Sequence, residues 1–385
     1  MPQQPDTTAI TAGRDGSASL APALWPSTVW ESDSLDDATR RATGLRSDHF
    51  YTRFSNPTVS QFEQAIAELE GAESAIAFGS GMGALATLVL SLCSSGSHIV
   101  AQNNIYGATA TFLQGPCARF GIETTFVDPT VPGSFAEAVI PGRTMLVIAE
   151  TPSNPRLTLS NLQELGAIAG PFTVVDSTLA TPLGQRPLDF GVDIVMHSAT
   201  KGIGGHNDAL LGVLAGESDL INEVWSYAVM HGASASPYDA LNALRGIRTL
   251  GVRTERQNTT ALTVAHMLQS HSAVDAVHHP FLETHPQHEL ARSQMRYGGS
   301  VLSFELKNGI DACRTFVERL QLAHIATSFG GPETLVCHPA TSTHVGLDKA
   351  TLEKVGVTPG LLRLSVGLEN ASDIVADIEQ ALHGL

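Results

Sequence analysis

Short apolar segments alternate with helical segments along residues 59–215, and this alternation constrains the fold more than any other feature of the sequence. The apolar runs are typical of buried strands, and the stretches between them have helical periodicity. Apolar strands between helices imply a mostly parallel sheet that helices cover on both faces. Seven strands are predicted, at Ser74–Phe78, His98–Gln102, Thr124–Val127, Met145–Ala149, Phe172–Val175, Val192–Met196 and Leu210–Ala215.

The pattern changes after about residue 250, where a long helix with many polar positions is predicted over Arg253–Ser270. Two strands and two helices beyond it indicate a smaller α/β domain at the C-terminus. They are predicted at Ser300–Leu306, Leu361–Val366, Ala312–Leu320 and Asp373–Leu382. Residues 1–30 are polar and then rich in Ala, Pro and Ser, so we expect an extended arm. We divide the chain into an arm (1–50), a large domain (51–250) and a C-terminal domain (251–385).

The composition limits what the protein binds. A net charge of −16 argues against nucleic acid and against an anionic membrane surface as partners. The four cysteines form no CxxC pair, which argues against a disulfide framework and a metal site and favours a cytoplasmic location. No stretch is apolar enough for a signal peptide or a membrane span, so we expect neither.

Lys201 is one of four lysines in the chain and comes shortly after the predicted strand that ends at Met196. A lysine past the end of a buried strand is poorly solvated, which favours the neutral amine that can form a Schiff base. Ser198 and Thr200 beside it offer hydroxyl groups to a phosphate. A lysine next to such hydroxyls is what pyridoxal 5′-phosphate (PLP) requires, whereas the alternative is a solvated lysine in a surface loop.

Asp176 closes the predicted strand Phe172–Val175. A carboxylate at a buried strand end needs a cationic partner, because an unpaired buried charge is costly. A protonated pyridine nitrogen is such a partner, and the pairing would keep the pyridine ring able to accept electrons. The alternative is an ordinary aspartate at a helix N-cap or in a loop.

The strand Ser74–Phe78 runs into the glycine-rich segment Gly79–Ala84, which is followed by a helix. Backbone N–H groups at the start of a helix bind phosphate. A dinucleotide-binding loop has a similar glycine pattern, but it requires an acidic residue at the end of the next strand to bind ribose. That strand ends in Gln102 and is followed by Asn103 and Asn104. We therefore rank a nicotinamide cofactor low.

Three further loops carry groups that suit a flat, phosphorylated cofactor. Tyr106 is placed to stack on a ring and to move a proton, although a lone tyrosine there is also typical of packing at a helix start. Asn154 lies in a proline-flanked loop and is suited to donate to a ring oxygen, with Glu150 as a structural residue. Tyr51 and Arg53 face the same way in an extended segment and would clamp a phosphate, unless they form a solvated surface.

Together these residues resemble the PLP-dependent enzymes of cysteine and methionine metabolism. This family includes methionine γ-lyase, cystathionine γ-lyase, cystathionine γ-synthase and O-acylhomoserine sulfhydrylase. The resemblance extends from about residue 45 to the end of the chain and is closest to methionine γ-lyase. The stretches that match in order are Tyr51–Thr58, Gly79–Ala84, Tyr106–Thr109, Glu150–Pro155, Asp176–Pro182, His197–Asp208, Arg245–Leu250, His285–Ala291, Ser328–Leu335 and Leu361–Glu369.

The resemblance implies a type I, aspartate aminotransferase-like PLP fold and a homotetramer built from two tight dimers. It implies that Lys201 binds the cofactor covalently and moves protons, and that Asp176 pairs with the pyridinium nitrogen. Tyr106 is then expected to stack on the ring and to protonate the leaving group. These roles are implied by the family and not by the spacing of the residues.

Two further sets of residues are implied in the same way. The phosphate is expected to contact Gly81, Met82, Ser198 and Thr200. The neighbouring subunit is expected to add Tyr51 and Arg53 to the phosphate site, so that each active site is built from two chains. The carboxylate of a small amino-acid substrate is expected to contact Asn154, Ser328 and Arg363.

The implied reaction is α,γ-elimination on a γ-substituted L-amino acid, such as methionine, homocysteine or an O-substituted homoserine analogue like canavanine. One alternative is γ-replacement, as in O-acylhomoserine sulfhydrylase or cystathionine γ-synthase. A second is cystathionine β-lyase. A third, from a different class, is a non-catalytic PLP-binding protein on the same scaffold. Loss of activity in Lys201→Ala distinguishes the enzymes from this last class.

Five positions bear on which member of the family the chain is. Ala108 stands where methionine γ-lyases usually have a cysteine, and Phe50 stands where cystathionine enzymes usually have an acidic residue. Ser177 replaces the usual asparagine after Asp176, and Gly202 replaces an aromatic residue after Lys201. Glu333 matches the lyases better than the sulfhydrylases. We expect an altered pocket, and the leaving group stays open.

Overall fold

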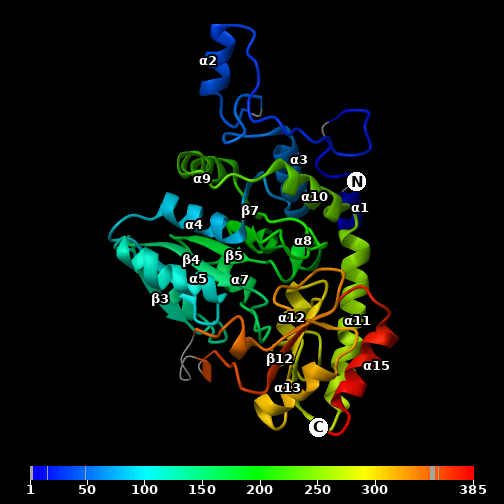
Figure 1. Cartoon of the computed structure of the whole chain (residues 1–385). Helices are drawn as coiled ribbons and strands as arrows, with labels where there is room; N and C mark the ends of the chain where they lie inside the picture. Colours follow the sequence, from blue (N-terminus) through cyan, green and yellow to red (C-terminus); the bar gives the residue numbers. More distant parts are fainter. Residues whose placement is uncertain (1–2, 15, 48, 347–351, 354) are drawn as a thin grey trace.

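Two β-sheets organise the fold of the computed structural model, which describes residues 3–14, 16–47, 49–346, 352–353 and 355–385 (Figure 1). The larger sheet has the strand order β1-β7-β6-β5-β4-β2-β3. Its strands are β1 (Ser74–Phe78), β2 (His98–Gln102), β3 (Glu123–Val127), β4 (Thr144–Glu150), β5 (Phe172–Asp176), β6 (Ile194–His197) and β7 (Gly212–Gly216). All seven predicted strands are present, with ends shifted by no more than a few residues.

The larger sheet is mostly parallel, as predicted. Strands β3, β2, β4, β5 and β6 pair in parallel, whereas β7 is antiparallel to both β6 and β1. The reversal has a simple cause. Two consecutive strands that pair in parallel must be joined by a crossover connection, which usually contains a helix. The connection between β6 and β7 is a loop that contains Lys201 and no helix. The chain therefore returns beside the strand that it has just left.

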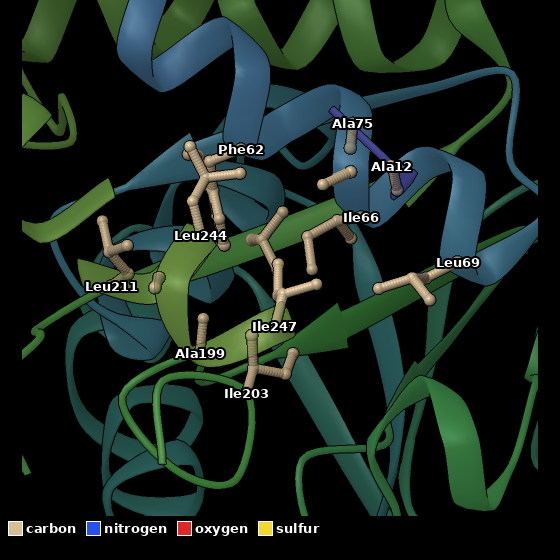
Figure 2. Packing of buried hydrophobic residues seen from close by; sticks show 14 of the residues in the cluster. Ala12, Phe62, Ile66, Leu69, Ala75, Ala199, Ile203, Leu211, Leu244 and Ile247 are labelled. Atoms are coloured by element: carbon tan, nitrogen blue, oxygen red, sulfur yellow. The ribbon is translucent and has the colours of Figure 1, made fainter. Parts of the chain in front are cut away.

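Helices cover both faces of this sheet (Figure 1). On one face α3 (Pro57–Glu70) and α10 (Pro237–Arg248) pack through Phe62, Ile66, Leu244 and Ile247, which Figure 2 shows in one apolar cluster. On the other face lie α4 (Gly81–Leu92) and α9 (Ser218–His231). Successive strand side chains point to opposite faces, and each face is therefore buried.

The second sheet has five strands in the order β10-β11-β12-β9-β8. They are β8 (Val274–His278), β9 (Val301–Leu306), β10 (His324–Ile325), β11 (Leu335–Cys337) and β12 (Leu361–Ser365). Helices α13 (Gly309–Arg319) and α15 (Ala371–Leu382) pack on it. The long helix α11 (Leu250–Ser270) runs past both sheets along one side of the molecule (Figure 1). The limits proposed for the three domains stay a prediction.

The predicted helix Ala108–Phe120 is interrupted in the structure. Helix α5 (Gly107–Phe112) passes into a π-helical turn, η1 (Leu113–Cys117), which contains Pro116. Proline has no N–H to donate to the preceding turn, and its ring crowds the carbonyl there, so regular α-helical bonding cannot continue. Shorter helices complete the fold, at α6 (Ser134–Glu137), α7 (Leu162–Gly166), α8 (Thr181–Gly184) and α12 (His288–Gln294).

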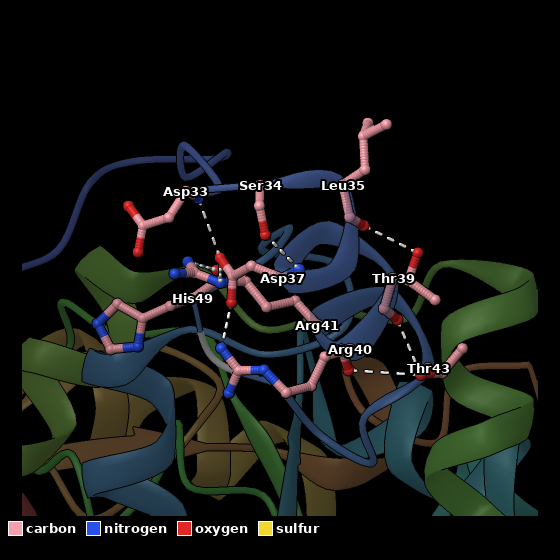
Figure 3. Close-up of polar contacts among 9 residues, drawn as sticks. All are labelled: Asp33, Ser34, Leu35, Asp37, Thr39, Arg40, Arg41, Thr43 and His49. Atoms are coloured by element: carbon pink, nitrogen blue, oxygen red, sulfur yellow. Dashed lines mark hydrogen bonds and ion pairs between the residues drawn. The ribbon is translucent and has the colours of Figure 1, made fainter.

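The prediction that residues 1–30 form an extended arm is wrong in part, because they contain one helix, and a second helix follows before residue 50. Helix α1 (Pro5–Thr11) packs against α3, α10 and α11 and buries Ala9. Helix α2 (Leu35–Thr43) stands away from the sheets (Figure 1). Figure 3 shows what holds α2 together: Ser34 caps its first turn, and Asp37 pairs with Arg40 and Arg41. Tertiary packing and local ion pairs, which composition does not reveal, form these helices.

No helix in the described part of the chain combines the length and the apolar character that a membrane span needs. The four cysteines are all buried as free thiols.

Two histidines after β8 are buried as neutral imidazoles. His279 donates from Nε2 to the Gly299 carbonyl at 3.1 Å, and its Nδ1 accepts the N–H of Phe281 at 3.3 Å. The Nδ1 of His285 accepts the N–H of Gln287 at 3.1 Å. A proton on either Nδ1 would face the backbone N–H group that this nitrogen accepts, so protonation would break the hydrogen bond. Burial is the largest cause that lowers the pKa of each ring to about 4, and neighbouring histidines, which would repel a second proton, lower it further.

We expect the protein to lose stability as the pH falls from about 6.5 to about 4. In this window the unfolded chain binds a proton on each ring that the folded protein excludes, so the unfolding free energy falls by about 1.4 kcal/mol per pH unit for each histidine. Above pH 6.5 both states are neutral and the effect vanishes. Urea unfolding at several pH values measures it. His279→Gln should have a shallower pH slope than the matched surface variant His324→Gln, and equal slopes would contradict the assignment.

Candidate active site

The predicted site residues meet in a cavity of about 390 Å³ at the C-terminal ends of β4, β5 and β6. Ligands bind at this edge in open α/β sheets. Its walls come from separate parts of the chain, including the smaller sheet. The predicted residues that line it are Gly81, Met82, Tyr106, Asn154, Asp176, Ser198, Thr200, Lys201, Ser328 and Arg363. Tyr51 and Arg53 are the two predicted residues that do not line it.

The loop that carries Lys201 is fixed on the side opposite the cavity. Ala199 and Ile203 are buried in the apolar cluster of α3 and α10, as Figure 2 shows. Arg253 of α11 donates to the carbonyl oxygens of Gly202 at 2.7 Å and of Ile203 at 3.2 Å. The apolar side chains and the guanidinium together hold the loop, so that Lys201 points into the cavity.

The Lys201 amine is held by a hydroxyl group and not by a carboxylate. Its Nζ donates to Ser328 Oγ at 2.8 Å and lies 5.6 Å from the centre of the Phe329 ring. Ser328 has a left-handed backbone with φ of 81°, a conformation that non-glycine residues adopt rarely. Burial lowers the pKa of Lys201, and the nearby Arg363 lowers it further. Both effects favour the neutral amine, which is the nucleophilic form.

Asp176 lies at the end of β5, beside Glu150 in the register of β4. Its Oδ1 accepts the backbone N–H of Thr178 at 3.0 Å and the hydroxyl of the same residue. Burial raises the pKa of Asp176, which the bonds from Thr178 and the charge of His197 partly offset. No cationic side chain bonds to Asp176 in the described residues. A carboxylate of this kind is stabilised by a cation that arrives with a ligand.

The N-terminus of α4 faces the Lys201 loop at close range. A Cβ added to Gly81 would lie 2.9 Å from the Cβ of Ser198, so only glycine permits this approach. Free N–H groups of the first helical turn and the hydroxyl of Ser198 therefore meet at one end of the cavity. Thr200 also lines the cavity, but its hydroxyl donates to the Leu211 carbonyl and accepts the Leu211 N–H.

Arg363 of β12 enters the cavity from the smaller sheet. Its Nη1 donates to Asn154 Oδ1 at 3.0 Å and its Nη2 donates to the Ser328 carbonyl at 2.6 Å. Only 3% of the residue is exposed, and Nε has no partner in the described structure. Burial lowers the pKa of Arg363, and its contacts are neutral groups. A buried guanidinium without an acidic partner is suited to a ligand carboxylate.

Tyr51 and Arg53 do not reach this cavity within one chain. Residues 52–54 form a turn, closed by a bond from the Phe54 N–H to the Tyr51 carbonyl, and the prediction of an extended segment is wrong here. Arg53 donates to the Val229 carbonyl at 2.6 Å and lies 5.6 Å from the centre of the Tyr51 ring. The side chain of Tyr51 is exposed, at 42%.

Two of the positions that depart from the family pattern, Ser177 and Gly202, lie outside the lining of the cavity. Ser177 is fully buried and accepts a bond from Gln185, and Gly202 faces Thr181, whose Cγ2 would lie 2.9 Å from an added Cβ. Ala108 does not line the cavity either. The expectation that these positions alter the pocket stays a prediction, and such an effect would have to pass through the residues that they contact.

Two residues of this site were missed by sequence reasoning. Thr178 links Asp176 to the Lys201 loop, because its hydroxyl also accepts the N–H of Ser198 at 2.8 Å. Its position two residues after Asp176 could have indicated that it bonds to the Asp176 carboxylate. Arg253, which holds the Lys201 loop, lies 52 positions away in a helix that reads as polar, and no sequence signal connects the two.

A family model described as Cys/Met metabolism PLP-dependent enzyme matches residues 6–383. The chain belongs to this family. An L-methionine gamma-lyase from Fusobacterium nucleatum subsp. nucleatum is 40% identical over 98% of this chain and 97% of that protein. A cystathionine beta-lyase from Coxiella burnetii is 40% identical over 89% of this chain and 90% of that protein. The shared family is certain at this similarity, whereas the named activities of these relatives differ.

The fold of the family is also found in solved structures. A cystathionine gamma synthase from Xanthomonas oryzae pv. oryzae superposes with a TM-score of 0.92, at 34% identity, over 99% of this chain and 98% of that chain. The predicted type I fold, with its seven-stranded sheet and smaller C-terminal sheet, is therefore confirmed. The protein is a PLP-dependent enzyme of cysteine and methionine metabolism that acts on a small amino acid.

The cavity fits PLP because its charged groups lack protein partners of opposite sign. Lys201 suits an aldehyde, Asp176 suits a pyridinium nitrogen, and the α4 N-terminus with Ser198 suits a phosphate. The described residues contain no group of three or more His, Cys, Asp or Glu side chains arranged to hold a metal ion.

Proposed function

We propose that this cavity is the active site and that the enzyme catalyses α,γ-elimination on a γ-substituted L-amino acid. One observation carries the proposal: the Lys201 amine and the Arg363 guanidinium face the same cavity, and both contact Ser328. An amino-acid carboxylate on Arg363 would direct the amino-acid Cα toward Lys201. Bound PLP supplies an electron sink for the carbanion that forms at Cα.

Lys201 performs the proton transfers in this proposal. Its Nζ would hold the cofactor covalently until the amine of the substrate takes its place. The free amine would then take the Cα proton, pass that proton on and, neutral again, accept a proton from Cβ, which γ-elimination requires. Ser328 holds the amine between these steps through the 2.8 Å hydrogen bond, and Asn154 and Ser328 hold Arg363 in place to bind the carboxylate.

Tyr106 is proposed to protonate the leaving group. It lines the cavity from the N-cap of α5, with 43% of its surface exposed. Its backbone N–H donates to Glu150, the register partner of Asp176, at 2.6 Å, and all three residues line the cavity. We propose that its phenol reaches the γ-substituent of a substrate whose carboxylate is bound by Arg363.

Elimination is proposed over replacement because the chain resembles the lyases at Glu333 and because its relatives include methionine γ-lyases. Glu333 accepts a hydrogen bond from Asn207 at 2.8 Å, at the base of the loop that carries Ser328. The γ-substituents proposed are the thioether of methionine, the thiol of homocysteine and an O-linked group such as that of canavanine. The second candidate is γ-replacement, which is favoured by the resemblance of the fold to a cystathionine gamma synthase.

A product assay on the purified, PLP-loaded protein tests the proposal. Methionine, homocysteine, cystathionine, O-acetylhomoserine, canavanine and cysteine are offered separately, with and without an added thiol. We expect 2-oxobutyrate and ammonia without added thiol, and homoserine from canavanine only where water adds at Cγ after the oxyguanidine group has left. The substrate with the highest kcat/KM identifies the leaving group. Turnover that requires a thiol would establish γ-replacement, and pyruvate from cystathionine would establish a β-lyase.

We also propose a homotetramer in which two chains build each active site. The support is the position of Arg53, which resembles a phosphate-binding residue of the family and yet lies outside the cavity of its own chain. The exposed ring of Tyr51 beside it fits the same assignment. In this arrangement Tyr51 and Arg53 complete the phosphate site of the neighbouring chain.

A further inference from the structure

Glu150 is a buried acid in the cavity wall for which the reaction above has no use. It ends β4, only 6% of it is exposed, and it lines the cavity. Its carboxyl oxygens are both occupied by backbone groups: Oε2 accepts the N–H of Tyr106 at 2.6 Å, and Oε1 accepts the N–H of Asn154 at 2.9 Å. Because neither oxygen is free, Glu150 is not placed to act as an acid or a base toward substrate.

The two amides belong to loops with different tasks. Tyr106 begins α5 and presents its ring to the cavity, whereas Asn154 orients Arg363 through its side chain. No backbone–backbone bond joins these two residues in the described structure. The carboxyl group of Glu150 is thus a direct bridge between the residue beside the cofactor and the residue beside the substrate-binding arginine.

The backbone of Glu150 is itself fixed from behind by a buried polar network. The N–H of Glu150 donates to Gln102 Oε1 at 2.8 Å, and the Ser160 hydroxyl donates to the same oxygen at 3.0 Å. Gln102 also donates to Asn104, which donates to the Ser153 hydroxyl. The bridge therefore rests on a buried polar network that also joins the two loops, through Asn104 and Ser153.

A negative charge on Glu150 is costly at this buried position. Burial and the neighbouring Asp176 raise the pKa of Glu150 to about 8, against the two N–H bonds, which lower it. The other charged side chains that face this part of the cavity are Lys201 and Arg363, and neither bonds to Glu150 in the described residues. An amide would avoid the charge but would offer only one acceptor to two donors. The two backbone N–H groups therefore require a side chain with two acceptor oxygens at this position, which a carboxyl group provides.

We propose that Glu150 is a positioning residue, which sets the distance between the Tyr106 ring and the Asn154–Arg363 pair by holding both backbones with one carboxyl group. The inference rests on the assignment of this cavity as the active site. It does not depend on which γ-substituent leaves. The enzyme thereby fixes the cofactor ring and the substrate carboxylate to a common point.

The test compares Glu150→Gln with wild type as holoenzymes. Glutamine keeps the shape but turns one N–H toward a backbone N–H, so one of the two bonds is lost. We expect kcat/KM to fall at least tenfold, with kcat lowered through Tyr106 and KM raised through Asn154. The visible circular dichroism of the bound PLP should weaken as the Tyr106 ring shifts. Glu164→Gln is the matched control, because Glu164 also accepts a backbone N–H, from Gly133 at 3.0 Å, on the exposed surface.

Two further variants separate positioning from a general structural role. Glu150→Asp is less similar in shape but keeps two acceptors, and we expect it to retain more of kcat/KM than Glu150→Gln. A purely structural residue predicts the reverse order. In a Tyr106→Ala background the kcat loss caused by Glu150→Gln should shrink below threefold, and full additivity would overturn the proposal. So would unchanged dichroism, which is read without substrate and therefore fails independently of the proposed reaction.

Discussion

Replacing Lys201 with alanine should lower turnover of the best substrate by at least about 10⁴-fold, because the variant loses both the covalent attachment of the cofactor and the base that moves the protons. Among the described residues that line the cavity, Lys201 is the one lysine. The other lysine in the described residues, Lys307, lies in an exposed turn of the smaller sheet. No second lysine of the described structure is therefore placed to take over the proton transfers.

A labelling experiment on the wild-type enzyme tests where the cofactor is attached. Treatment of the wild-type holoenzyme with borohydride reduces the bond between the amine and the cofactor, and mass spectrometry of the peptides then locates the added mass. We expect it on Lys201 alone. Lys307→Ala, the matched control, should keep the activity and the label. A label on a different lysine, or activity that survives in Lys201→Ala, would remove Lys201 from the mechanism.

Most strands of the larger sheet are predictable from the sequence because burial on both faces leaves a continuous apolar run, whereas the edge strand β3 is only partly buried. The polar strand ends of this sheet are equally visible, because a charge such as Asp176 at the end of a buried run is unusual and requires a reason. Lys201 stands out for the same cause. The sequence does not reveal the direction in which each strand runs. Nothing in Gly212–Gly216 distinguishes β7, which pairs in antiparallel fashion, from the strands of the sheet that pair in parallel.

Contacts between residues that are far apart in the chain are the other feature that the sequence does not reveal. Glu150 reads as structural from its loop, and its role emerges only when the bond to Tyr106, 44 residues earlier, is known. Arg253 reads as one more polar position on a solvated helix, although it is nearly fully buried against the Lys201 loop. In both cases the residue acts on backbone groups, which carry no side-chain signature that a sequence could display.

Substrate selectivity is hidden for a related reason. Ala108, Ser177 and Gly202 mark departures from the family pattern, yet none of them lines the cavity. An effect of these positions on the cavity has to pass through the residues that they pack against, such as Thr181 beside Gly202. Small shifts of this kind decide between leaving groups that differ by little in size and are set by packing in three dimensions.

Two inactive variants, Arg53→Ala and Lys201→Ala, should regain activity when they are co-expressed. In a mixed dimer one site has an intact Lys201 from its own chain and receives Arg53 from the partner, whereas the other site lacks both. Random pairing makes half of the dimers mixed, each with one working site, so roughly a quarter of the wild-type activity is expected. Each variant alone should be nearly inactive, Arg53→Ala because it loses a guanidinium from the phosphate.

The structure supplies the control for this experiment. Lys201 and Arg363 line the same cavity of a single chain, so every site in a mixture of Lys201→Ala and Arg363→Ala lacks one of them. That mixture should stay inactive. If it recovers as well, subunits are exchanging activity by a route other than a shared site. If neither mixture recovers although mixed dimers are shown by native mass spectrometry, Arg53 serves its own chain, and its bond to the Val229 carbonyl is then a fold contact only.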